Sequence, residues 1–156
     1  DEWVPGWIET MTAVARDEAA HLAQVTRILL RRGGRLGRSH TNPYATGLRR
    51  MVRKGQLGDT IDRLFVSALI EARSCERFAV LSEAAAAAQD EELSAFYRAL
   101  YASELGHYTV FINLARKIAP AEEVEKRWQE LLAAEANLLA EQLPGPRMHS
   151  GVPPTE

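Results

Sequence analysis

Apolar side chains recur every three or four residues over four long runs of the chain, the spacing that places them on one face of an α-helix. The predicted helices cover residues 7–32, 59–88, 90–119 and 121–142. The first ends at a pair of glycines, and Asp59 or Thr60 is the predicted cap of the second. Asp90 is a suitable N-cap for the third helix, which Pro120 terminates. Helices of this length predict an all-α, up-down helical bundle.

Two segments lack this periodicity. Residues 33–58 contain six glycines and many arginines, which predicts a long connection with one short helix near residues 45–54. The proline-rich end, residues 143–156, is expected to form an extended tail. A chain of 156 residues is long enough for one domain with its own core, so we predict a single helical domain over residues 1–156.

Composition narrows the class of protein. The formal net charge of -2 gives no overall attraction to nucleic acid or anionic lipid, so such a partner requires a local patch. Cys75 is the only cysteine, which excludes an internal disulfide and a zinc finger. The sequence has no run of 18 apolar residues and no basic segment followed by an apolar stretch at its N-terminus. We therefore expect a cytoplasmic protein without a membrane partner.

Two predicted helices carry the same pair of metal-binding residue types. Glu104 and His107 form an E-x-x-H pair within an apolar stripe, where an uncompensated carboxylate would be strongly disfavoured. Glu18 and His21 repeat the pair on the first helix. Residues three apart share a helical face, so each pair is within reach of one ion. A single pair is more often a solvated face, but two pairs on apolar faces favour a metal site.

A further glutamate ligand is expected from the second long helix. Glu71 and Glu76 flank opposite sides of its apolar stripe, and spacing alone does not choose between them. We prefer Glu71 as the ligand, with Glu76 as a neighbour of the site or an ion-pair residue for Arg73 or Arg77. Two E-x-x-H helices with single glutamates from two others form the ligand set of di-iron and di-manganese bundles, whose open positions would admit dioxygen. Glu135 also lies in an apolar stripe and is interpreted as a hydrogen-bonded or rim carboxylate.

A second candidate site is electrostatic. Eight cations and no acidic residue occupy the 24 residues from Arg31 to Lys54, so this segment carries +8 and the rest of the chain -10. A solvated loop is the ordinary interpretation of such a run, and a phosphate-binding surface is the functional one. The sequence alone favours neither. The candidate phosphate-binding residues are Arg35, Arg38, Arg49, Arg50, Arg53 and Lys54.

Several motifs occur together in a specific combination. The run ALIEARSCERF at residues 68–78 is the most distinctive of them. The others are Phe96-Tyr97, Ser103-Glu104 with His107-Tyr108, the segment Asn42-Pro43-Tyr44-Ala45 and the tail segment Arg147-Met148-His149-Ser150-Gly151. With these motifs the chain resembles the MiaE family of tRNA hydroxylases, from about Met11 to Gly151.

The resemblance implies a ferritin-like, non-haem di-iron monooxygenase. Such an enzyme hydroxylates the isopentenyl group of 2-methylthio-N6-isopentenyladenosine next to the tRNA anticodon, using two iron ions, dioxygen and an unidentified electron donor. The metal ligands implied by the resemblance are Glu18, His21, Glu71, Glu104 and His107. The basic segment would then approach the anticodon stem-loop, as a backbone clamp beside a recessed pocket.

The resemblance also requires one more glutamate, from a helix that precedes Glu18. Residues 1–6 are too few to supply it, and Glu2 and Glu9 are poor substitutes because they belong to the approach or first turns of the same helix. We therefore expect that the chain, which begins at Asp1, lacks the first helix of its bundle and that a longer parent protein supplies it. Two alternatives stay open: another ferritin-like oxidase, peroxidase or storage protein, and a metal-free helical RNA-binding protein.

Overall fold

The computed structural model describes residues 4–37, 41–143, 145, 148 and 149. Its helices are α1 (Trp7–Arg31), α2 (Pro43–Arg50), α3 (Gln56–Ala87), α4 (Glu91–Ile118) and α5 (Ala121–Ala140), and the described residues contain no strand. The prediction of an all-α chain is therefore confirmed. The chain divides into two compact units, Asp1–Thr41 and Asn42–Glu156, which are described separately. That residues 1–156 form one domain stays a prediction.

The first unit consists mainly of α1, whose predicted span is confirmed to within one residue. The helix ends in a Schellman motif: the amide of Gly33 donates to the carbonyl of Leu30, and the amide of Gly34 donates to that of Leu29. Gly33 has φ 77°, a left-handed conformation that glycine adopts at little cost. The glycine pair therefore terminates the helix as its position in the sequence indicated.

The start of α3 differs from the prediction. The helix begins at Gln56, with Gly55 as its N-cap residue at φ 115°, so Asp59 and Thr60 are not its cap. Asp59 instead lies in the first turn, where a carboxylate is stabilised by the helix dipole, and its Oδ2 accepts from Arg63 Nε at 2.7 Å. The prediction was wrong because the left-handed glycine lets the chain enter the helix one turn earlier.

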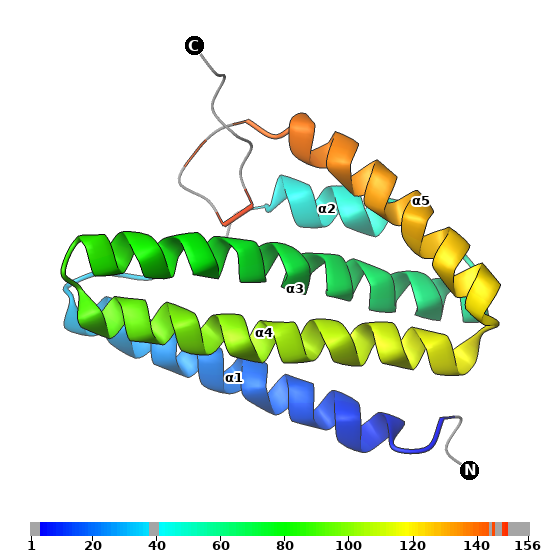
Figure 1. Ribbon diagram of the computed structural model, residues 1–156, viewed down its shortest axis with the longest axis horizontal. Helices are drawn as coiled ribbons and strands as arrows, with labels where there is room; N and C mark the ends of the chain where they lie inside the picture. Colours follow the sequence, from blue (N-terminus) through cyan, green and yellow to red (C-terminus); the bar gives the residue numbers. More distant parts are fainter. Residues whose placement is uncertain (1–3, 38–40, 144, 146–147, 150–156) are drawn as a thin grey trace. The chain divides into compact units, whose positions relative to one another are not determined.

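The turn between α3 and α4 brings the two longest helices side by side and antiparallel (Figure 1). Asp90 is the N-cap of α4, as predicted, and its Oδ1 accepts from the amide of Leu93 at 3.1 Å. The amides of Gln89 and Asp90 donate to the carbonyls of Ala86 and Ala85, which again makes a Schellman motif. This turn sets the register in which side chains of α3 face those of α4.

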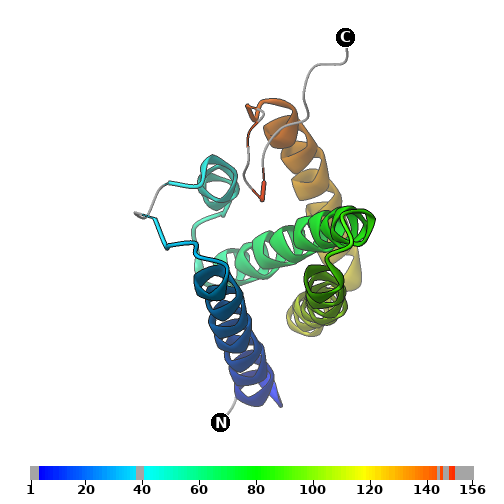
Figure 2. The ribbon, with the colours of Figure 1, turned by 90° about the vertical axis from the view of Figure 1, so that its left-hand side faces the viewer.

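Within the second unit, α2 and the later part of α5 lie on one side of α3, and α4 lies on the other (Figures 1 and 2). Tyr44 and Leu48, one turn apart on α2, are fully buried, as are Phe65 on α3 and Leu131 on α5. A Cβ atom at Gly47 would lie 2.6 Å from Leu138 Cδ1, so the absence of a side chain lets α2 pack closely against α5. The core of this unit thus fixes α2 on the α3–α5 surface.

Candidate metal centre

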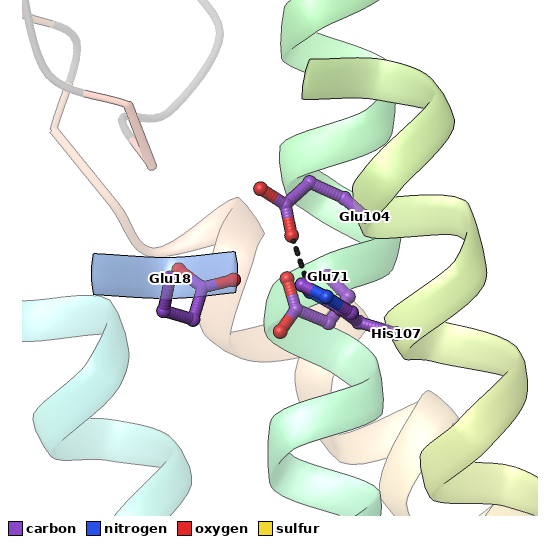
Figure 3. Close-up of side chains that lie close together, drawn as sticks. All are labelled: Glu18, Glu71, Glu104 and His107. Carbon is purple, nitrogen blue, oxygen red and sulfur yellow. Dashed lines mark hydrogen bonds and ion pairs between the residues drawn. The ribbon is translucent and has the colours of Figure 1, made fainter. Parts of the chain in front are cut away.

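Three of the predicted ligands converge between α3 and α4 (Figure 3). Glu71 comes from α3, and Glu104 and His107 lie one turn apart on α4. One candidate ligand atom from each lies within 4.8 Å of those of the other two. Glu104 Oε2 is 3.1 Å from His107 Nδ1. Both residues are buried, with 4% of Glu104 and 5% of His107 exposed. The two residues of the E-x-x-H pair therefore lie side by side on one face of α4, as their spacing in the sequence predicted.

The chemistry of these donors fits a metal ion. Two carboxylates close together in a largely buried position repel each other and lose hydration, so a cation between them lowers the free energy of the site. Carboxylate oxygens with one imidazole nitrogen suit iron and manganese, and no thiolate is required. The residues that the second unit brings together thus fit an ion of this class.

Cys75 lies beside this cluster and is buried. Burial, followed by the negative charges of Glu104 and Glu71, raises the pKa of its thiol to about 11. Its sulfur lies 3.7 Å from the backbone carbonyl of Tyr101, to which the thiol donates. Cys75 is therefore a protonated packing residue at neutral pH.

The second E-x-x-H pair belongs to the first unit. Glu18 and His21 lie one turn apart on α1, and Glu18 Oε1 is 3.6 Å from His21 Nδ1. The pair is thus formed within its own helix in the same manner as Glu104 and His107. Its role as a ligand pair stays a prediction.

Glu76, the rival of Glu71, has a different environment. Its Oε2 accepts from Arg73 Nη1 at 2.6 Å, and its side chain is 63% exposed. The ion-pair alternative for Glu76 is therefore confirmed, while it is Glu71 whose carboxylate lies near Glu104 and His107. The choice depends on the rotation of α3 about its own axis against α4, which the periodicity of one helix does not contain.

A buried ion-pair cluster that the sequence analysis did not identify surrounds Asp62 on α3. This fully buried carboxylate accepts from Arg53, through the backbone amide at 2.8 Å, Nε at 3.1 Å and Nη2 at 3.0 Å. Arg127 on α5 donates to it through Nε at 2.9 Å and Nη2 at 2.8 Å. Burial by itself would raise the pKa of Asp62, but hydrogen bonds from Arg127 and Arg53 outweigh it and hold the pKa below its usual range.

A second buried cluster surrounds Glu135 on α5. Arg73 Nε and Nη2 donate to its two carboxylate oxygens at 2.6 and 3.0 Å, and the hydroxyl of Tyr44 donates to Oε1 at 2.9 Å. Burial and the charge of Glu135 raise the pKa of Tyr44 well above its ordinary value, so the phenol stays protonated. The ring of His149 stacks on Tyr44 with centroids 4.7 Å apart. The expectation of a hydrogen-bonded Glu135 is confirmed.

The basic segment divides into residues with different surroundings. Arg49 and Arg50 occupy the last turn of α2 and are exposed, as is Lys54. Arg53 is engaged with Asp62 and belongs to that ion-pair cluster. Arg35 is an exposed residue of the first unit, and Arg38 lies outside the described residues. RNA binding by these residues stays a prediction.

None of the described helices combines the length and apolar character that crossing a membrane requires. The cytoplasmic localisation stays a prediction.

Comparison with known proteins places these observations in a family. The family profile described as tRNA-(MS[2]IO[6]A)-hydroxylase (MiaE) matches residues 3–150. A tRNA 2-(methylsulfanyl)-N(6)-isopentenyladenosine(37) hydroxylase of Pseudomonas putida (strain KT2440) is 40% identical, over 94% of this chain and 69% of its own length. The protein of the same name from Salmonella typhimurium (strain LT2) is 36% identical, over 98% of this chain and 55% of its own length. The chain thus spans little more than half of this second relative.

A solved structure gives independent support for the fold. It is described as protein 43 with aldehyde deformylating oxygenase activity, from Synechococcus, and is 35% identical with a TM-score of 0.86. The similarity covers 94% of this chain and 73% of that one. The fold is the ferritin-like all-α fold that the resemblance implied. With the family profile matching nearly its whole length, the chain belongs to the MiaE family of tRNA hydroxylases.

Proposed function

We propose that this chain forms the metal-binding part of a non-haem di-iron monooxygenase that hydroxylates the isopentenyl group of 2-methylthio-N6-isopentenyladenosine in tRNA. The observation that carries the proposal is the convergence of Glu71, Glu104 and His107 in a chain of this family. Both named relatives are hydroxylases of that nucleoside. The family makes the chain an oxidoreductase that modifies tRNA.

The proposed ligands are Glu71, Glu104 and His107 of the second unit, with Glu18 and His21 of α1. Support for the α1 pair is its identical spacing and its interaction within one helical turn. Two iron ions bound there would activate dioxygen with two electrons from a donor, and manganese is compatible with the same donors. The residues of the chain would hold the ions, and burial of Glu104 and His107 keeps bulk water from their ligand atoms.

The RNA-binding role is assigned to the exposed cations of the second unit. Arg49, Arg50 and Lys54 lie at and just after the end of α2, and arginine suits bidentate contacts with phosphate. Because the net charge of the chain is only -2, binding of an anticodon stem-loop would depend on such a local surface.

The test is iron analysis of the full-length protein together with hydroxylation of tRNA that carries the modified nucleoside. His107→Ala should lose bound iron and hydroxylation. Glu76→Gln is the matched control, because it also removes a titratable side chain, from the same helix as Glu71, but one that is exposed and pairs with Arg73. A His107→Ala protein that keeps its full iron content would contradict the ligand assignment. Failure of the iron-loaded wild type to hydroxylate the modified nucleoside would contradict the proposed substrate.

A second candidate function is a ferritin-like oxygenase that acts on an aldehyde. It is favoured by the similarity to the Synechococcus protein, whose description names aldehyde deformylating oxygenase activity. Substitution of the arginines at the C-terminal end of α2 distinguishes the two candidate functions. Replacing Arg49 and Arg50 by Gln should lower turnover of tRNA severalfold, whereas an enzyme that acts on an aldehyde would keep its turnover.

A further inference from the structure

Helix α2 requires an explanation for its stability. It has eight residues, and isolated helices shorter than about 12 residues are marginal in water. Its outer positions include the exposed Arg49 and Arg50, whose like charges add no stability to each other. Packing of Tyr44 and Leu48 supplies an apolar contact for its inner face. The ends of the helix are held by other interactions.

At its N-terminal end, α2 is tied to the Glu135 cluster. The hydroxyl of Tyr44, the second residue of the helix, donates to Glu135 Oε1 on α5. The same carboxylate accepts two hydrogen bonds from Arg73 on α3. Asn42 caps the helix, since its Oδ1 accepts from the amide of Ala45 at 3.3 Å. The start of α2 is therefore connected to both α3 and α5.

At its C-terminal end, α2 is tied to the Asp62 cluster. Met51 is the C-cap residue, and its carbonyl accepts from Arg127 Nη2 at 2.9 Å. Two residues later, Arg53 donates to Asp62 through its backbone amide and its guanidinium. Arg127 also donates to Asp62 and so joins the chain after α2 to both α3 and α5.

The two clusters have opposite charge order. In one, α3 supplies the carboxylate of Asp62 and α5 supplies Arg127; in the other, α3 supplies Arg73 and α5 supplies the carboxylate of Glu135. Sliding one helix against the other would separate each buried charge from its partner, which is strongly unfavourable. The reciprocal pairs therefore fix the register of the surface on which α2 lies.

We propose that the Asp62–Arg53–Arg127 and Glu135–Arg73–Tyr44 clusters hold α2 in place as a preorganised platform that presents Arg49, Arg50 and Lys54 to RNA phosphates. Arg127, Arg73 and Tyr44 are then positioning residues that bind no RNA themselves. This inference rests on the proposed function, since it needs an RNA ligand. It also assigns Arg53 to the support of the platform.

The alternative is that the clusters merely stabilise the unit. Buried ion pairs are weak evidence for stability, because well-packed apolar residues of similar volume often do as well. A positioning role makes a separate prediction. Loss of one cluster should disorder α2 and weaken RNA binding, while the number of phosphate contacts made by the bound protein stays the same.

The experiment uses the full-length protein and a synthetic anticodon stem-loop RNA. Binding is measured over a series of salt concentrations, and amide hydrogen exchange is followed in α2 and α4. Arg127→Gln should lose exchange protection in α2 but keep it in α4. If α2 is then ordered about a tenth of the time, RNA affinity falls about tenfold. The slope of log affinity against log salt should be unchanged, because the same cations reach phosphates once α2 is bound.

The contact residues should behave differently. Replacing Arg49 and Arg50 by Gln should lower the salt slope by about 1 to 2, with α2 still protected. Arg63→Gln is the matched control, because it removes a cation one residue from Asp62 whose partner, Asp59, is at the surface. Arg63→Gln should leave α2 protection unchanged and RNA affinity within about twofold, the scale of a lost surface ion pair.

The proposal is overturned if Arg127→Gln loosens α2 without weakening RNA binding, or if it lowers the salt slope while α2 stays protected. Should that variant unfold the unit, Arg127→Lys keeps the charge, loses the forked geometry and is judged by the same criteria. A stem-loop that fails to bind the wild type overturns the inference and the RNA part of the proposed function together. If the wild type binds but replacing Arg49 and Arg50 leaves the slope unchanged, the platform and the assignment of RNA binding to these two arginines are overturned, while the proposed metal ligands and substrate are not.

Discussion

Glu104 and Glu135 are the same residue type at nearly the same burial, with 4% and 0% of the residue exposed, yet their surroundings are opposite. Glu135 accepts hydrogen bonds from Arg73 and Tyr44, so its charge is matched by an arginine from the neighbouring helix. Glu104 lies beside His107, and one of its carboxylate oxygens is within 4.8 Å of a carboxylate oxygen of Glu71. A buried acid with an arginine organises the fold, whereas two acids gathered with an imidazole create a place for a metal ion.

The largest expected difference between the two glutamates is in metal binding. Glu104→Ala should lower the affinity of the full-length protein for Fe(II) by more than about 100-fold, which exceeds the usual effect of losing a group outside the coordination sphere. Glu135→Gln should leave metal content unchanged. Iron per chain after dialysis against a weak chelator measures both, and equal losses in the two variants would erase the distinction.

In metal-free protein, the same substitution should have opposite effects on stability at the two positions. Glu135→Gln leaves the guanidinium of Arg73 without its buried partner and should cost about 3 kcal/mol. Glu104→Gln removes one of two neighbouring carboxylates and should raise the free energy of unfolding by about 1 kcal/mol. Denaturant unfolding with a chelator present compares them. A destabilised Glu104→Gln protein would show that Glu104 contributes to folding as Glu135 does.

The arginine-matched type of site also predicts a pH dependence. The pKa of Asp62 is held below its usual range by Arg127 and Arg53, so the folded state binds this proton less readily than the unfolded state. The associated stability is present above the unfolded pKa, about 3.9, and is lost as the pH falls through the lower folded value. Unfolding free energies of the wild type and Asp62→Asn measured between pH 6 and pH 3 should therefore converge at the acid end. Parallel curves would exclude the depressed pKa.

The smallest expected effect concerns the neutral member of the Glu135 cluster. Tyr44→Phe removes the hydroxyl that donates to Glu135 but leaves both hydrogen bonds from Arg73. The expected cost is about 1 kcal/mol, the usual net value of one buried hydrogen bond. Thermal unfolding measures it, and a cost similar to that of Glu135→Gln would mean that the phenol rather than the arginine stabilises the carboxylate.

The sequence predicted the helices well and the site in part. The E-x-x-H spacing placed Glu104 beside His107, and Asp90 was correctly assigned as a cap, because both features depend on neighbours within one turn. The start of α3 was missed because Gly55 adopts an unusual backbone conformation that its residue type allows but does not require. The role of Arg53 was missed because a run of cations carries no information about which of them has a buried partner elsewhere.

By itself, the sequence determined the helical segments, the candidate ligands and the family of the chain, since periodicity, caps and motifs are local properties of the chain. Only the tertiary structure decided that Glu71 and not Glu76 lies near Glu104 and His107, and that Arg73 and Arg127 are matched to Glu135 and Asp62. The two arginine–carboxylate pairs join residues that are 62 and 65 positions apart. Their formation depends on how α3 and α5 pack, and a pattern along one helix does not encode the rotation and register of another helix against it.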